Sequence, residues 1–145
     1  MPEKETLERA RRDKRQGKSP STQAGEFVHE EIEHVREGKH GARSTKQAIA
    51  IGLSKARRAG VKLGTPRTGS RRTKEQAKRD TRRAGTKPSP GRSRGALKAL
   101  KRYGRAAVSR AALARQARTA ARRRPASARS AAAKKAARTR ARRSG

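Results

Sequence analysis

The larger hydrophobic residues of the chain lie mostly in its first half, where they recur at helical spacing. Between residues 20 and 37, one such stripe is made by Ala24, Phe27, Val28, Ile32 and Val35. Ser19 is a candidate N-cap, and Pro20 stands at the first helical position, where its missing N–H is not needed. The pattern therefore predicts a helix over residues 20–37.

A second stripe follows a short connection and predicts a helix over residues 45–59, with an inner face made by Ala48, Ile49, Gly52, Leu53 and Ala56. Ser44 and Gln47 have the spacing of a capping box at its start. Glycine costs about 1 kcal/mol relative to alanine in a helix, so we expect Gly52 to serve a close approach of the first helix. Together the two stripes predict a small helical hairpin over residues 20–63. Such a hairpin is marginal alone, and we expect a second copy or a partner to close its core.

The remaining segments have weaker signals. Residues 1–17 predict a charged helix, stabilised by pairs such as Glu5 with Arg9. Residues 64–95 are rich in Gly, Pro, Ser, Thr and Arg and predict a basic linker with one short helix over residues 73–85. Residues 96–145 form an Ala/Arg/Lys-rich tail with the capacity to become partly helical on binding a partner.

Composition argues that much of the chain is disordered. Of 43 hydrophobic residues, 27 are alanine and only sixteen are larger, while the net charge is +32. Low hydrophobicity with high net charge is typical of disordered chains. The fold class predicted is mostly α with extensive disorder: a helical hairpin followed by a basic low-complexity tail.

The net positive charge increases from the start of the chain to its end. Residues 1–40 are neutral, residues 41–80 carry a net charge of +10, and residues 81–145 carry twenty-two bases and no acid. A polycationic segment of this kind binds polyanions, of which nucleic acid is the commonest in a cell. The acids of residues 20–37 include Glu26, Glu30, Glu33 and Glu37. We interpret them as a solvated helix face, with docking of the basic tail as the alternative.

The sequence lacks the residue patterns that catalysis, cofactor binding and metal binding usually require. The chain has no cysteine, no phosphate-binding loop and no nucleophile motif, so we expect no enzyme, no cofactor and no small-molecule substrate. His29 and His34 are five positions apart and do not share a helix face, so we expect these two and His40 to be exposed, with no metal site. No apolar run is long enough to span a membrane.

Two segments carry a resemblance: residues 19–28, SPSTQAGEFV, and residues 36–60, REGKHGARSTKQAIAIGLSKARRAG. The chain from residue 1 to about residue 64 resembles a family of small basic bacterial proteins of unknown function. This resemblance implies no activity, cofactor or defined partner. The tail separately resembles the histone H1-like basic tails of bacterial nucleoid proteins, although it favours Arg over Lys, 29 to 14 in the whole chain.

The sequence thus predicts a sequence-nonspecific, histone-like protein that neutralises and bridges the phosphates of double-stranded DNA in the nucleoid of a bacterial cytoplasm. The hairpin over residues 20–63 would supply self-association or contact with a partner. Two alternatives stay open: an RNA- or ribosome-associated protein, and a protein-interaction module whose tail only localises it. The bases expected to contact nucleic acid are Arg57, Arg58, Arg82, Arg83, Arg122, Arg123, Arg124, Lys134, Lys135, Arg138, Arg140, Arg142 and Arg143.

Overall fold

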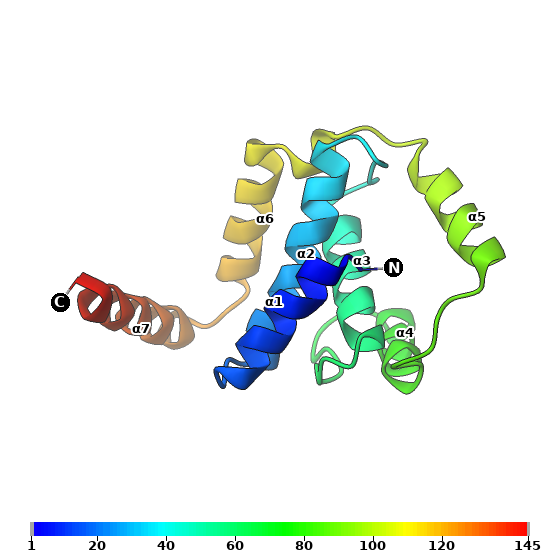
Figure 1. The fold of residues 1–145 in the computed structure, drawn as a ribbon. Coiled ribbons are helices and arrows are strands. Elements are labelled where there is room, and N and C mark those ends of the chain that lie inside the picture. Colours follow the sequence, from blue (N-terminus) through cyan, green and yellow to red (C-terminus); the bar gives the residue numbers. More distant parts are fainter. Residues whose placement is uncertain (1, 145) are drawn as a thin grey trace. The chain divides into compact units, whose positions relative to one another are not determined.

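The structure is a computed structural model that describes residues 2–144, and within that range it contains helices and no strand. The prediction of a mostly α protein is therefore confirmed. The helices, coloured in chain order in Figure 1, are α1 (Lys4–Arg15), α2 (Pro20–Arg36), α3 (Thr45–Arg58), α4 (Arg71–Arg82), α5 (Pro90–Leu100), the short 3-10 helix η1 (Ala106–Val108), α6 (Arg110–Arg122) and α7 (Ala126–Ser144).

The chain forms two compact units, residues 1–109 and residues 110–145. The first contains α1 to η1 and the second contains α6 and α7. Residues 64–95, expected to be a linker with one short helix over residues 73–85, contain α4 and the start of α5. In the first unit, the break between α5 and η1 includes Gly104.

Helices α2 and α3 form the expected hairpin, and their start signals act as the sequence indicates. The Ser19 hydroxyl accepts a hydrogen bond from the Thr22 N–H at 3.3 Å. The Ser44 hydroxyl accepts one from the Gln47 N–H at 3.1 Å, and the Gln47 side chain reaches back to the Arg43 N–H at 2.6 Å. These bonds satisfy amides that have no partner inside the helix, which fixes where each helix begins.

Gly52 lies where the two hairpin helices pack closely together. A Cβ atom built on Gly52 would be 2.6 Å from the Val28 Cα and 2.9 Å from the Val28 N. No larger residue fits at this position without moving a backbone. The close approach inferred from the sequence is confirmed.

The same chain covers both ends of the hairpin, through two hydrophobic clusters. In the first, Phe27 of α2 packs with Ala10 of α1, and Leu7 lies against them. In the second, Val108 of η1 packs with Val35 of α2 and Ala48 of α3. Helix α1 and η1 therefore provide cover that we had expected from a second copy or a partner.

Helix α4 is held against α3 by a buried carboxylate. Asp80 is 2% exposed and accepts hydrogen bonds from the Ser54 hydroxyl at 2.7 Å, the Arg58 Nε at 3.0 Å and the Gln76 amide at 3.1 Å. A buried charge is tolerated when it is paired and hydrogen-bonded in this way. Asp80 is the last acidic residue of the sequence, and its role is to hold α4 against α3.

The extensive disorder expected from composition is not supported. Helices α6 and α7 have no buried residue, yet both are regular. The share of large hydrophobic residues decides whether a segment can build a core. Whether the segment forms a helix depends instead on the helix propensity of its residues. Alanine and arginine are among the strongest helix formers, and they dominate both segments.

Candidate nucleic-acid interface

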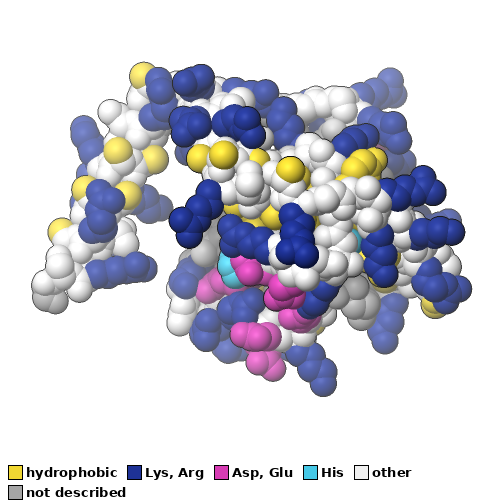
Figure 2. Space-filling view, turned by 90° about the horizontal axis from the view of Figure 1, so that it is seen from above, with side chains coloured by type: hydrophobic (Ala, Val, Ile, Leu, Met, Phe, Trp, Pro, Cys, Tyr) yellow, Lys and Arg dark blue, Asp and Glu magenta, His cyan; other side chains and the backbone are white. Residues whose placement is uncertain are grey.

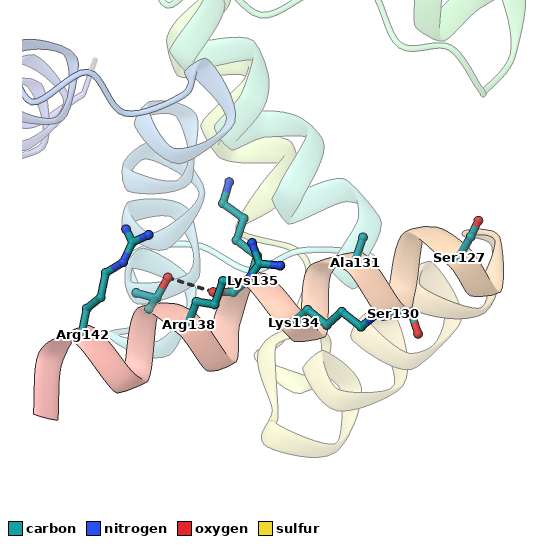
Figure 3. Close-up of a pocket in the computed structure, with 8 residues that line it drawn as sticks. Ser127, Ser130, Ala131, Lys134, Lys135, Arg138 and Arg142 are labelled. Atoms are coloured by element: carbon teal, nitrogen blue, oxygen red, sulfur yellow. Dashed lines mark hydrogen bonds between the residues drawn. The ribbon is translucent and has the colours of Figure 1, made fainter. Parts of the chain in front are cut away.

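Helix α7 gathers basic and hydroxyl side chains on one face. Lys134, Arg138 and Arg142 follow one another at intervals of four residues, so they share one side of the helix. Figure 3 shows these side chains along successive turns of α7. They line a shallow, open hollow together with Ser127, Ser130, Ala131, Lys135 and Thr139.

The bases of this face have no carboxylate to pair with in their own unit. Residues 110–145 contain thirteen bases and no Asp or Glu. Every residue from 126 to 144 is exposed. Like charges at i,i+4 destabilise an isolated helix by about 0.2–0.5 kcal/mol per pair. A bound polyanion would remove this repulsion, so the face is suited to phosphate.

The structure brings four of the thirteen predicted bases together on this face: Lys134, Lys135, Arg138 and Arg142. Arg140 and Arg143 belong to α7 without lining the hollow. Arg122, Arg123 and Arg124 are exposed at the end of α6 and in the turn that follows it.

The other four predicted bases belong to the first unit. Arg57 is 7% exposed and donates to the Gly64 carbonyl at 3.1 Å. Arg58 pairs with Asp80 at 3.0 Å. Both therefore have structural partners, while Arg82 and Arg83 are exposed at the end of α4.

The hydroxyls of the α7 face were missed by the sequence reasoning. Ser127, Ser130 and Thr139 line the same hollow as the bases. Hydroxyls donate hydrogen bonds to phosphate oxygens as lysine and arginine do. Ser130 stands four residues before Lys134 and Thr139 four residues after Lys135, and this helical spacing was the signal that could have found them.

The first unit contains a contrasting feature, a cluster of carboxylates and histidines. Figure 2 shows acidic side chains gathered in one patch with a histidine beside them, among many Lys and Arg side chains. The central residue of the cluster is Glu31, which is buried, with its side chain 1% exposed. The His40 Nε2 is 3.2 Å from the Glu31 Oε2, and the His34 Nδ1 is 3.8 Å from the Glu31 Oε1. Their ligand atoms lie close enough together to hold a metal ion, as do those of Glu3, Glu30 and His34.

This cluster corrects the expectation that the three histidines are exposed. His29 is exposed, but His40 is buried and the His34 side chain is 13% exposed. The sequence reasoning compared His29 with His34 within one helix. His40 follows α2 in the connection to α3, and the return of the chain places it against α2.

The acidic face of α2 is also less solvated than expected. Glu26 pairs with Arg9 of α1 at 2.7 Å. Glu30 is 4% exposed and accepts a hydrogen bond from the Glu3 N–H at 2.7 Å. Helix α1 and Glu3 therefore cover part of this face, so it is not simply a solvated surface, and docking of the basic tail on the rest of it stays a prediction.

Glu3 and Lys39 form an exposed ionic link beside this cluster. The hydrogen bond from His34 lowers the pKa of Glu3 below its ordinary value, and Lys39 adds to this effect. The hydrogen bond to Glu37, followed by that to Glu3, raises the pKa of Lys39. Each shift favours the charged form and so strengthens the link near neutral pH.

Among known proteins, one family model matches a region of the chain. Residues 4–67 match a family model described as "Family of unknown function (DUF6496)". The match spans α1, α2 and α3 and covers less than half of the 145 residues. It supports the resemblance to a family of unknown function, whereas the basic tail lies outside it. No curated protein and no solved structure matches the chain. Among the described residues, no helix has both the length and the apolar character to cross a membrane.

Proposed function

We propose that this chain is a non-enzymatic, histone-like protein that binds double-stranded DNA without sequence preference in the bacterial nucleoid. The observation that carries the proposal is the acid-free stretch of residues 81–145, which ends in the basic face of α7. Sequence-independent DNA binding requires charge and geometry suited to phosphates, and no base-reading side chains.

Binding would proceed through release of counterions from the DNA. Each phosphate neutralised by Lys or Arg frees condensed cations, which makes affinity fall steeply with salt. Helix α7 has 19 residues and is about 28 Å long, so its face can follow several phosphates. The hydroxyls of Ser127 and Ser130 would add hydrogen bonds to phosphate oxygens between the basic contacts, whereas the Thr139 hydroxyl donates to the Lys135 carbonyl at 3.0 Å.

Bridging follows from the distribution of charge over both units. Residues 1–109 carry a net charge of +19 and residues 110–145 carry +13. Each unit alone is thus cationic enough to hold a DNA segment. One chain could therefore contact two segments, which supports a role in neutralising and bridging DNA.

The experiment is a gel-shift series with the full-length chain against salt, using a duplex DNA probe. With about ten phosphates contacted, the slope of log affinity against log salt should be near −9. Competition at equal salt with ribosomal RNA identifies the preferred polyanion. Absence of binding to DNA at low salt would overturn the proposal, and strong preference for ribosomal RNA would replace it with the RNA-associated function.

A further inference from the structure

The carboxylate of Glu31 is buried, and one of its oxygens lacks a hydrogen-bond partner. The whole residue is fully buried. Its Oε1 is paired with the Lys55 ammonium, whereas its Oε2 has no hydrogen-bond partner among the described residues. A buried, unpaired carboxylate oxygen is costly. This oxygen therefore needs an explanation.

The group facing that oxygen is the His40 ring. The His40 Nδ1 is 2.8 Å from the Gly41 carbonyl oxygen and must carry a proton to donate to it. In the neutral ring the Nε2 is then a lone-pair acceptor, 3.2 Å from the Glu31 Oε2. Two acceptors facing each other at this distance repel unless a positive species lies between them.

His34 provides a third donor from the same helix as Glu31. Its Nδ1 is 3.8 Å from the Glu31 Oε1, and its ring meets that of His40 edge to face, with centroids 6.1 Å apart. Its Nε2 points away, 3.1 Å from the Glu3 Oε1 and 3.8 Å from the Glu30 Oε1. The Nδ1 is therefore the nitrogen left for the cluster.

We propose that Glu31, His34 and His40 form a binding site for a divalent transition-metal ion of the Zn²⁺ class. Two imidazoles and a carboxylate are a donor set that Zn²⁺ uses with a fourth position for water. Tetrahedral bonds of about 2.1 Å place neighbouring donor atoms about 3.4 Å apart, close to the 3.2 Å between His40 and Glu31.

The partners of the three side chains fit this assignment. Histidines that bind metals donate their other ring N–H to a carbonyl or carboxylate, and bound carboxylates are hydrogen-bonded in turn. His40 has the Gly41 carbonyl, His34 has the Glu3 carboxylate, and Glu31 has the Lys55 ammonium. Each ligand thus already has the outer partner that would orient it for a metal.

A proton on His40 explains the geometry less well. It would place an N–H toward Glu31, yet the 3.2 Å approach lacks the geometry of a hydrogen bond, and the Glu31 Oε2 stays unpartnered. A metal ion on the His40 lone pair can bond an oxygen that lies off the axis of that lone pair, because two donor atoms subtend an angle of about 109° at a tetrahedral ion. It also accepts the lone pairs of His34 and His40 at once.

The ion would link α2 to its connection with α3. That connection is also held to the end of α5, because the Gly41 N–H donates to the Leu100 carbonyl at 3.1 Å. A ligand that binds the folded state and not the unfolded chain raises stability. The site would therefore stabilise the first unit whether or not the chain binds DNA.

The test is Zn²⁺ titration of the EDTA-treated full-length chain, followed by calorimetry, by the visible absorption of Co²⁺ as a substitute ion, and by thermal unfolding. We expect one ion per chain and a higher Tm with metal. His40→Gln and His34→Gln should each weaken Zn²⁺ binding at least about tenfold. His29→Gln removes an exposed histidine of the same helix and should bind as the wild type does.

A second readout uses the wild type alone and does not depend on how the variants fold. Long-range ¹H–¹⁵N spectra of the histidine rings should show Zn²⁺ shifting the Nε2 resonance of His40 and the Nδ1 resonance of His34, with His29 unchanged. The proposal is overturned if the wild type takes up no stoichiometric Zn²⁺, or if these two nitrogens do not respond to it.

Discussion

At the residue scale, Gly52 is a position where the fold depends on a missing side chain. Gly52→Ala would gain about 1 kcal/mol of helix propensity but would push a Cβ against the Val28 backbone, and overpacking costs about 1–3 kcal/mol. Backbone cannot rotate away as a side chain can, so we expect a net loss of about 1–2 kcal/mol. Urea unfolding of the two proteins measures it.

Gly25 supplies the matched control, because it lies in α2 with nothing within 4 Å of an added Cβ. Gly25→Ala should stabilise the chain by about 0.4–1 kcal/mol through the unfolded state. Equal effects at the two positions would show that the helices do not cross as closely at Gly52 as the structure has them.

Glu3 provides a pH-dependent test of the contact between the start of the chain and α2. Its pKa is lowered in the folded state by the hydrogen bond from His34 and by Lys39. A carboxyl whose folded pKa is depressed stabilises above its unfolded pKa, about 4.3, and this contribution is lost as pH falls through the folded value. We expect Glu3→Gln to lower Tm at pH 7 and to have progressively less effect below about pH 4.

The control is Glu75→Gln, which removes the same charge from an exposed position of α4. It should leave Tm nearly unchanged at pH 7, because an isolated surface pair contributes little. A Tm difference for Glu3→Gln that persists undiminished at pH 3 would contradict the ionic link.

At the element scale, the helices that the sequence predicts well are those with both a hydrophobic stripe and a start signal. Helix α2 has its stripe, Ser19 and Pro20, and its predicted and observed bounds differ by one residue at one end. Helix α7 has no stripe and no buried residue, so periodicity could not find it. Its helicity depends on the helix propensity of alanine and arginine, from which we predicted only that the tail can become partly helical on binding a partner.

The basic face of α7 makes a prediction that separates geometry from total charge. Replacing Lys134, Arg138 and Arg142 with Gln should flatten the salt slope of DNA binding by about 2.7, because three phosphate contacts are lost. Glutamine keeps helix propensity, so α7 should stay folded. Gel shifts at several salt concentrations measure the slope.

The same triple substitution at Arg129, Arg140 and Arg143 removes equal charge from residues of α7 that do not line the hollow. We expect the slope to change by less than about 1 for this control. Identical slopes for the two variants would mean that only the number of charges matters and that α7 presents no preferred face.

At the scale of the whole molecule, the sequence located the hairpin but not what covers it. Large hydrophobic residues over 20–63 identified a core that was too small to stand alone. The missing cover comes partly from Val108, which lies 45 residues beyond the end of the predicted hairpin at residue 63, within the stretch assigned to the tail. The carboxylate–histidine cluster was missed for the same reason, since its members meet through tertiary packing and not through spacing in one helix.

The extent of the first folded unit can therefore be tested by where the chain is cut. A chain of residues 1–109 keeps η1, whereas a chain of residues 1–105 loses Val108, which is 2% exposed, and the hydrogen bond from the Thr45 hydroxyl to the Ala107 carbonyl at 2.5 Å. Burying a valine contributes about 1.5–3 kcal/mol and the hydrogen bond about 1 kcal/mol, so the shorter chain should be about 2–4 kcal/mol less stable. Urea unfolding followed by circular dichroism measures both. The four residues that distinguish the two chains, 106–109, carry no charged side chain, so a difference in net charge cannot produce the difference in stability. Equal stability would show that the hairpin closes its core without η1, and the assignment of residues 106–108 to the first unit would then have no energetic basis.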